Sequence, residues 1–169
     1  MAPTESYAAP ARKLPEVAAR DLLARKADEL WTITPDKTVL DAIGEMADHR
    51  VGALLVADGE SLCGIVSERD CLVRCVLVGK QAGATLVSEI MTEKVVTIGL
   101  DATMRGCMKL MTVRRVRHLP VIDEDRIVGM LSIGDLVREA IEQQSHVIDE
   151  LERYVAGEPR LAAEGSPKW

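Results

Sequence analysis

The sequence contains almost no aromatic residues. They make up 2% of the 169 residues, and phenylalanine is absent. A core of this chain must therefore be aliphatic, and a hydrophobic share of 47% is large enough to build one. The same scarcity argues against single-stranded nucleic acid as a ligand, because proteins that bind it stack the bases on aromatic side chains.

The chain also has no excess of positive charge. Its net charge of −6 repels nucleic acids and anionic membranes, so a bound anion would need a local basic cluster. No apolar run reaches the ~18 residues that span a bilayer, and the first residues lack the basic-then-apolar pattern of a signal peptide. We therefore expect no nucleic-acid partner, no membrane partner and a cytoplasmic location.

What the sequence does contain is an internal repeat. Residues 32–70 align without a gap to residues 97–135, sixty-five positions further on, and thirteen of the aligned residues are identical. Unrelated segments of that length would share about two or three, so the two units are duplicates. The matched pairs include Asp36/Asp101, Thr38/Thr103, Arg50/Arg115, Gly64/Gly129, Ser67/Ser132 and Asp70/Asp135.

Hydrophobic periodicity and turn residues predict the same order of elements in each unit, namely a short strand, a helix, a β-hairpin and a second helix. The first unit has helices expected at 38–49 and 67–78 around strands at 52–56 and 62–66. The second has a helix at 103–113, strands at 117–122 and 127–131, and a helix from 132. The expected parts of the chain are a flexible tail (1–15), repeat 1 (16–80), repeat 2 (84–143), a helical extension (144–156) and a second flexible tail (157–169).

The last helix continues beyond the repeat. Its apolar residues recur at alternating spacings of three and four as far as Val155, which is typical of a helix–helix seam. The helix could lie across its own domain, but the length of the extension favours contact with a second protomer.

The sharpest motif is Gly-x-x-Ser-x-x-Asp, which runs from Gly64 to Asp70 and again from Gly129 to Asp135. Ser-x-x-Asp at a helix start is typical of a capping box, which is a purely structural role. A helix start also offers unpaired N–H groups to phosphate or sugar oxygens, and a carboxylate there can accept from vicinal ribose hydroxyls. If Asp135 serves a ligand alone, Asp135→Ala should leave the ligand-free protein nearly as stable, whereas loss of a cap costs about 0.5–2 kcal/mol.

A cationic cluster on this acidic chain favours the ligand interpretation. Arg117 and His118 enter a predicted strand, where a helix-end role does not explain them, and a phosphate there would gain charge-assisted hydrogen bonds. At the matching place the first unit has Gly52 and Ala53, which let a flat ring approach the backbone. One ligand could therefore span the junction of the two units.

Chemistry other than binding finds little support. Aligned by the repeat, all four cysteines fall on apolar core positions, where a free cysteine behaves as a small hydrophobic residue. The chain has no CxxC pair, no HExxH motif, no phosphate-binding P-loop and no evident set of nucleophile, base and acid. We therefore expect neither an enzyme nor a metal site.

The doubled motif, with Val-x-Asp before each turn, resembles the CBS domain, named after cystathionine β-synthase, over residues 16–143. The resemblance implies an α+β fold of two tandem CBS repeats, each with a small three-stranded sheet, packed with pseudo-twofold symmetry and followed here by the long C-terminal helix. Such pairs are non-catalytic regulatory modules that bind AMP, ADP, ATP, S-adenosylmethionine or NAD between the repeats, and they usually form homodimers.

The resemblance also assigns roles to residues. Asp70 and Asp135 would hold ribose hydroxyls with Ser67 and Ser132 beside them. The remaining nucleotide-binding residues that it implies are Ile65, Met130, Leu23 and Met91 at adenine, Arg117 and His118 at phosphate, and Gly52 and Ala53 on the opposite wall. The Asp70 cleft carries Arg69 where repeat 2 has Gly134, so we expect the Asp135 cleft to be the better site.

Two functions follow as hypotheses. The first is a sensor of adenine nucleotides that signals to a partner protein by a conformational change. The second is a scaffold that oligomerises through its C-terminal helix and whose nucleotide clefts are vestigial.

Overall fold

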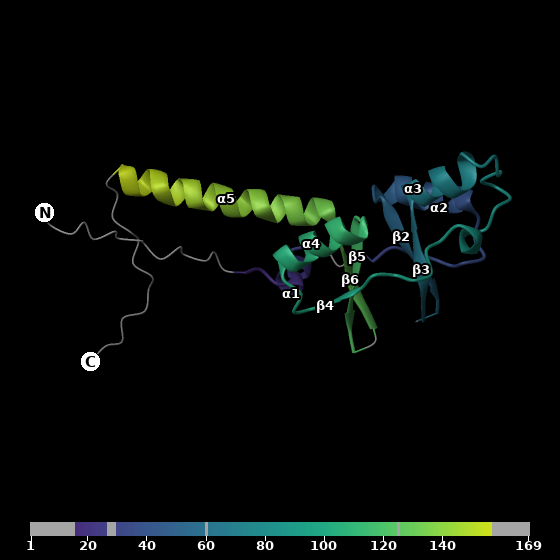
Figure 1. The fold of residues 1–169 in the computed structure, drawn as a ribbon, viewed down its shortest axis with the longest axis horizontal. Coiled ribbons are helices and arrows are strands. Elements are labelled where there is room, and N and C mark those ends of the chain that lie inside the picture. The colour runs from purple at the N-terminus through teal and green to yellow at the C-terminus, as the bar shows by residue number, and fades with distance from the viewer. Residues whose placement is uncertain (1–15, 27–29, 60, 125, 157–169) are drawn as a thin grey trace, which may run out of the picture.

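The computed structural model describes residues 16–26, 30–59, 61–124 and 126–156. It contains two α+β repeats and a long C-terminal helix, as the resemblance implies (Figure 1). The first repeat consists of β1 (Thr32–Ile33), α2 (Val39–His49), β2 (Ala53–Asp58), β3 (Ser61–Ser67), α3 (Glu68–Cys71) and η1 (Leu72–Val76). The second consists of β4 (Ile98–Gly99), α4 (Met104–Arg114), β5 (His118–Asp123), β6 (Arg126–Ser132) and α5 (Ile133–Val155). The segments α1 (Ala19–Ala24) and η2 (Val87–Glu89) precede them.

Each repeat has a three-stranded sheet, and the two sheets have the same topology. β1 pairs in parallel with β2, and β2 pairs antiparallel with β3; β4, β5 and β6 follow the same order. The registers differ by the sixty-five positions of the sequence repeat, since Val56 pairs with Gly64 and Val121 with Gly129. The predicted duplication is confirmed down to a register shift that follows Val56 and Val121 in both hairpins.

Capping residues explain where the first helix of each repeat begins. The hydroxyl of Thr38 accepts from the N–H of Asp41 (3.1 Å), and the hydroxyl of Thr103 accepts from the N–H of Gly106 (3.1 Å). These bonds satisfy N–H groups that have no partner within the helix. The helices therefore begin at the two threonines that the sequence pattern selects.

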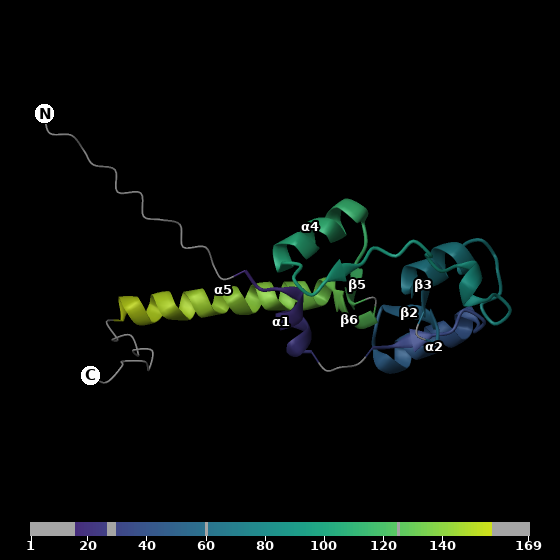
Figure 2. The same cartoon turned by 90° about the horizontal axis from the view of Figure 1, so that it is seen from below.

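We call α1 and the stretch around η2 the leading segments, because they precede repeat 1 and repeat 2 in the chain. Each leading segment packs in the core of the other repeat. Ala19 and Leu22 of α1 pack in the core of repeat 2, whereas Val87 and Ile90, from the segment before repeat 2, pack in the core of repeat 1. Figure 2 shows α1 beside α5 and away from α2. Each segment is held by an isolated bridge, Ala18 to Thr103 and Leu86 to Thr38. The expected limits of the repeats, 16–80 and 84–143, divide the chain in sequence order. In the folded structure, each core contains residues from both ranges.

The second helix of repeat 1 differs from the expected regular helix at 67–78. After one α-helical turn the chain continues as the π-helix η1, in which the N–H of Leu77 donates to the carbonyl of Leu72, five residues back (2.9 Å). A π turn is wider than an α turn. Both cysteines of this stretch, Cys71 and Cys75, point into the core.

The cysteines occupy apolar positions as predicted. Cys71, Cys75 and Cys107 are buried, and the partly buried Cys63 packs against the core of repeat 1. Burial raises the pKa of the Cys71 thiol to about 11, and the neighbouring carboxylate of Asp70 raises it further. A thiol in this state is a poor nucleophile.

The long helix α5 leaves its own repeat. Only Leu136 and Glu139 of its residues are buried, and the C-terminal part of the helix extends away from the sheets (Figure 1). No helix among the described residues is long and apolar enough to cross a membrane. The expected tails at 1–15 and 157–169 lie outside the described residues.

Candidate functional site

The starts of β2 and β5 face each other at the seam between the repeats. A Cβ placed on Gly52 would lie 3.6 Å from Cε1 and 3.7 Å from Nε2 of His118, and 3.4 Å from a carboxylate oxygen of Glu68. Because β2 and β5 are equivalent strands of the two repeats, this contact joins matching ends of the two sheets. The structure thus brings together the small residue and the histidine that the sequence placed on opposite walls.

At the start of α5, Asp135 forms the capping box with Ser132. Its Oδ2 atom accepts from the backbone N–H of Ser132 (2.8 Å) and from its hydroxyl (2.7 Å), while the N–H of Asp135 donates to the Ser132 hydroxyl (3.2 Å). The structural interpretation of the motif is therefore confirmed. Asp135→Ala would remove a cap as well as a ligand group, so we now expect this change to lower ligand-free stability rather than to spare it.

A second cation, absent from the sequence-based site, meets the same carboxylate. The Nζ atom of Lys26, just after α1, lies 3.0 Å from Asp135 Oδ2 and donates to the carbonyl of Met130 (3.2 Å). Its neighbour Arg25 donates to Glu139 on the next turn of α5 (2.5 Å). Together these contacts fix the end of α1 against α5 and β6.

Repeat 1 has the same capping box with a different cation. Asp70 Oδ2 accepts from the N–H of Ser67 (3.0 Å) and from its hydroxyl (2.5 Å). Arg74, on the same helical stretch, places Nε 3.5 Å from Asp70 Oδ1 and donates from Nη1 to the carbonyls of Ile90 and Met91. The acid of repeat 1 is therefore met from its own helix, and that of repeat 2 from a separate segment.

The charges around Asp135 shift two pKa values. Burial raises the pKa of Asp135, but the hydrogen bonds from Ser132 and Lys26 outweigh burial and leave this pKa below its usual value. Burial lowers the pKa of His118, and the positive charge of Lys26 lowers it further; Asp135 opposes these effects. The carboxylate is thus ionised and the imidazole neutral at pH 7.

The residues expected at adenine lie on the leading segments and on the return strands. Leu23 packs so closely on Gly129 that an added Cβ would lie 2.6 Å from its Cδ2 atom. Met91 packs in the same way on Gly64, with its sulfur 3.0 Å from the added Cβ. Ile65 also pairs through its backbone with Thr92. The glycine of each motif therefore makes room for an apolar side chain of the leading segment that packs on its repeat.

Other predicted residues differ in how accessible they are. Arg69 and Arg117 are exposed, and Met130, Ser67 and Ser132 are partly buried. Ala53 has no exposed surface, so it supports the seam from within, and only Gly52 of the expected wall faces His118.

Sequence reasoning missed Lys26, Arg74 and Glu68. For Arg74 a signal existed, because the repeat aligns it with Glu139, a position that carries opposite charges in the two units and anchors the leading segment in both. Lys26 had no such signal. Leu23 and Met91 are equivalent at a separation of sixty-eight positions, so an overlay at sixty-five misaligns the whole segment before β1.

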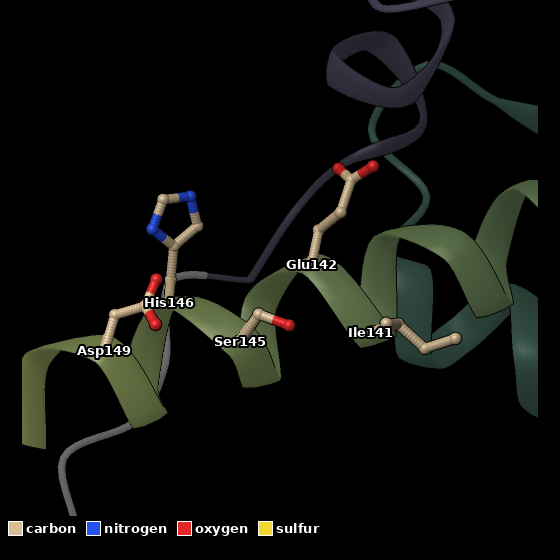
Figure 3. A pocket seen from close by; sticks show the side chains of 5 residues that line it. All are labelled: Ile141, Glu142, Ser145, His146 and Asp149. Carbon is tan, nitrogen blue, oxygen red and sulfur yellow. The ribbon is translucent and has the colours of Figure 1, made fainter. Parts of the chain in front are cut away.

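A shallow hollow lies on the extended part of α5, away from the seam (Figure 3). Its described lining residues are Ile141, Glu142, Ser145, His146 and Asp149. All five belong to one helix, so they do not by themselves enclose a ligand. Among the described residues, no group of three or more His, Cys, Asp or Glu side chains could hold a metal ion.

Comparisons with known proteins agree with this architecture. The CBSX3 protein of Arabidopsis thaliana, a mitochondrial CBS domain-containing protein, is 38% identical over 139 residues, which are 79% of this chain and 68% of that protein. The crystal structure of a protein with CBS domains from Burkholderia ambifaria is 42% identical, with a TM-score of 0.74 over 76% of this chain and 96% of the other.

A more distant structure resembles the chain in fold. It is the CBS domain pair of protein MJ0100, in complex with 5′-methylthioadenosine and S-adenosyl-L-methionine, which is 21% identical with a TM-score of 0.67 over 76% of this chain and 99% of that one. The family model of the CBS domain matches residues 19–76 and 87–142. With both repeats matched, the chain belongs to the CBS domain family and contains a tandem pair of CBS domains.

Proposed function

We propose that this protein is a non-catalytic sensor that binds an adenine nucleotide of the AMP, ADP, ATP or NAD class in the cleft headed by Asp135. The observation that carries the proposal is the Asp135 carboxylate, which Ser132 holds at the start of α5 through Oδ2 alone. A carboxylate held in this way can accept from ribose hydroxyls, the usual partners of such an acid in nucleotide sites.

The charge around the cleft favours an anionic ligand. Lys26 and Arg117 are positively charged and lie at the Asp135 end of the seam, and both lower the pKa of His118, whose neutral imidazole can still donate a hydrogen bond. A phosphate there would gain charge-assisted hydrogen bonds, whereas the sulfonium of S-adenosylmethionine would be repelled. This argument places nucleotides ahead of other adenosine-containing ligands.

Thermal unfolding with AMP, ADP, ATP and NAD tests the proposal. A ligand that binds only the folded state raises the melting temperature as its concentration exceeds Kd. We expect a rise with at least one nucleotide in the wild type and a much smaller rise in Asp135→Asn, whose amide oxygen still accepts the two bonds of the capping box. Asp70→Asn is the matched control. If no nucleotide at millimolar concentration shifts the wild type, the sensor proposal is wrong.

Signalling would use the same seam. Because the contact between Gly52 and His118 joins equivalent strands of the two repeats, a ligand held there would favour one relative placement of the repeats over another. A regulated partner protein would bind one of these placements. Hydrogen exchange with and without nucleotide would reveal this, as altered protection at β2 and β5 together.

A second candidate, a scaffold, is favoured by the exposed end of α5. Ile148, Leu151, Tyr154 and Val155 are 54–84% exposed, which is unusual for apolar side chains at helical spacing. Contact with a second copy in a homodimer would bury these side chains and so stabilise the helix. Truncation after Gln143, followed by light scattering and nucleotide titration, separates the functions: a sensor retains binding, and a scaffold loses its dimer.

A further inference from the structure

The end of α1 places an ammonium group inside the cleft that the proposed ligand would use. Lys26 Nζ contacts both Asp135 Oδ2 and the carbonyl of Met130, which are the expected ribose-binding and adenine-lining residues. Its side chain is 39% exposed and that of Asp135 is 18% exposed, so the lysine is the more accessible partner of this ion pair. A nucleotide that enters would meet Lys26 first.

The equivalent acid in repeat 1, Asp70, has a cationic partner that is held by more bonds to the rest of the protein. Arg74 holds Asp70 from the same helical stretch, and its guanidinium also donates to two backbone carbonyls of the leading segment. Displacing Arg74 would break its bonds to that segment. Lys26 bonds only to atoms of the cleft itself, so its ammonium can leave while Arg25 keeps the end of α1 attached to Glu139.

We propose that Lys26 is a displaceable plug of the Asp135 cleft that makes the cleft select phosphorylated nucleosides over uncharged ones. This inference rests on the proposed function and adds its specificity. A nucleoside without phosphate must displace the ammonium from Asp135 and provides no new anionic partner for it. A nucleotide displaces it from the carboxylate and accepts it at the phosphate, beside Arg117 and His118.

The asymmetry of the two clefts follows from the same contacts. The cation at Asp70 is locked and the cation at Asp135 is removable, so only the second cleft can exchange a side chain for a ligand. Lys26 also lies six residues before Thr32, the first residue of β1, where the chain passes from α1, packed on repeat 2, to repeat 1.

Calorimetric titration of AMP and adenosine into wild type and Lys26→Met tests the plug. In the variant we expect adenosine to bind about three-fold more tightly, since no ion pair must be broken. AMP should lose affinity because one charge-assisted bond to phosphate is gone, so that the preference for AMP over adenosine falls at least about ten-fold. Lys80→Met is the matched control, because it removes a 2.8 Å surface ion pair with Glu89 and changes the net charge equally.

A ligand-free measurement accompanies the titration. Lys26 lowers the pKa of His118, so an NMR titration of Lys26→Met should show this pKa raised, and Lys80→Met should leave it unchanged. If both ligands bind the wild type and the ratio of their affinities is the same in Lys26→Met, the plug proposal is wrong and the sensor proposal still stands. If neither binds to the wild type or to Lys26→Met, the sensor proposal fails and the plug fails with it.

Discussion

At the scale of the residue, the two repeats use the same acid in different surroundings. Asp70 and Asp135 occupy equivalent positions, and a serine three residues earlier caps both helices. The difference lies in the cation that meets each carboxylate and in the histidine beside Asp135, which has no counterpart because the repeat aligns it with Ala53. The two clefts are therefore chemically distinct although their backbones match.

The stability of the protein should depend on the protonation of His118. Its pKa is lowered in the folded state by burial and by Lys26, so the unfolded chain binds this proton more readily. Stability from this group is complete above the unfolded value near about 6.5 and is lost as the pH falls through the folded value. Urea unfolding at pH 7.5 and 5.5 should show a smaller loss for His118→Gln than for the wild type; equal losses would contradict the shift.

The two motif glycines should differ in their tolerance of a side chain. A Cβ on Gly64 would lie 2.9 Å from the backbone oxygen of Thr92, which cannot rotate away, whereas a Cβ on Gly129 meets only the methyl groups of Leu23. We expect Gly64→Ala to cost about 1–3 kcal/mol and Gly129→Ala less than half of that. Chemical denaturation of both variants measures the difference, and a larger cost at Gly129 would show that Leu23 is rigid.

At the scale of the element, the leading segments are fixed by one helix position of opposite charge. In repeat 2 the buried Glu139 accepts from Arg25, and in repeat 1 the aligned Arg74 donates to Ile90 and Met91. Each anchor suits its target, because α1 offers a guanidinium and the other segment offers carbonyl oxygens. The second helix of each repeat therefore holds the segment that precedes the other repeat.

Removing the cation from the α1 anchor should destabilise the protein markedly. Arg25→Met leaves the carboxylate of Glu139, only 6% exposed, without its charged partner, and we expect a loss of about 1–3 kcal/mol. Arg20→Met on the same helix, whose ion pair with Asp101 is exposed, should cost less than about 1 kcal/mol. Urea titration compares them, and Arg25→Met combined with Glu139→Gln should recover part of the loss.

The sequence predicted the repeated elements well and the leading segments poorly. Helices α2 and α4 begin at their threonine caps, and both hairpins lie where the apolar runs and turns placed them. These features depend on local residues, so local reasoning finds them. The π-helix, the ion pair of Lys26 and the loss of Ala53 from the cleft surface depend on contacts between segments far apart in the chain, which no periodicity encodes.

At the scale of the whole molecule, the two halves are interdependent. The core of repeat 2 includes residues from the start of the described chain, and the core of repeat 1 includes residues that follow it in sequence. A change in either leading segment should therefore be felt in the repeat to which it is bound rather than in the repeat next to it in the chain.

Core substitutions in the leading segments test this arrangement. We expect Leu22→Ala to cost about 2–5 kcal/mol and to speed hydrogen exchange in β5 and β6, although Leu22 precedes repeat 1. Ile90→Ala should do the same to β2 and β3. If Leu22→Ala instead sped hydrogen exchange in β2 and β3, the packing of α1 in the core of repeat 2 would be contradicted.

The crossed connections have a consequence for assembly. A helix that leaves its own half to complete the other performs, inside one molecule, the operation that produces entwined dimers when it occurs between molecules. The α1 helix of a second chain has the same residues and would fit the same core of repeat 2. Reciprocal donation of α1 between two chains would therefore preserve every contact that α1 makes in that core.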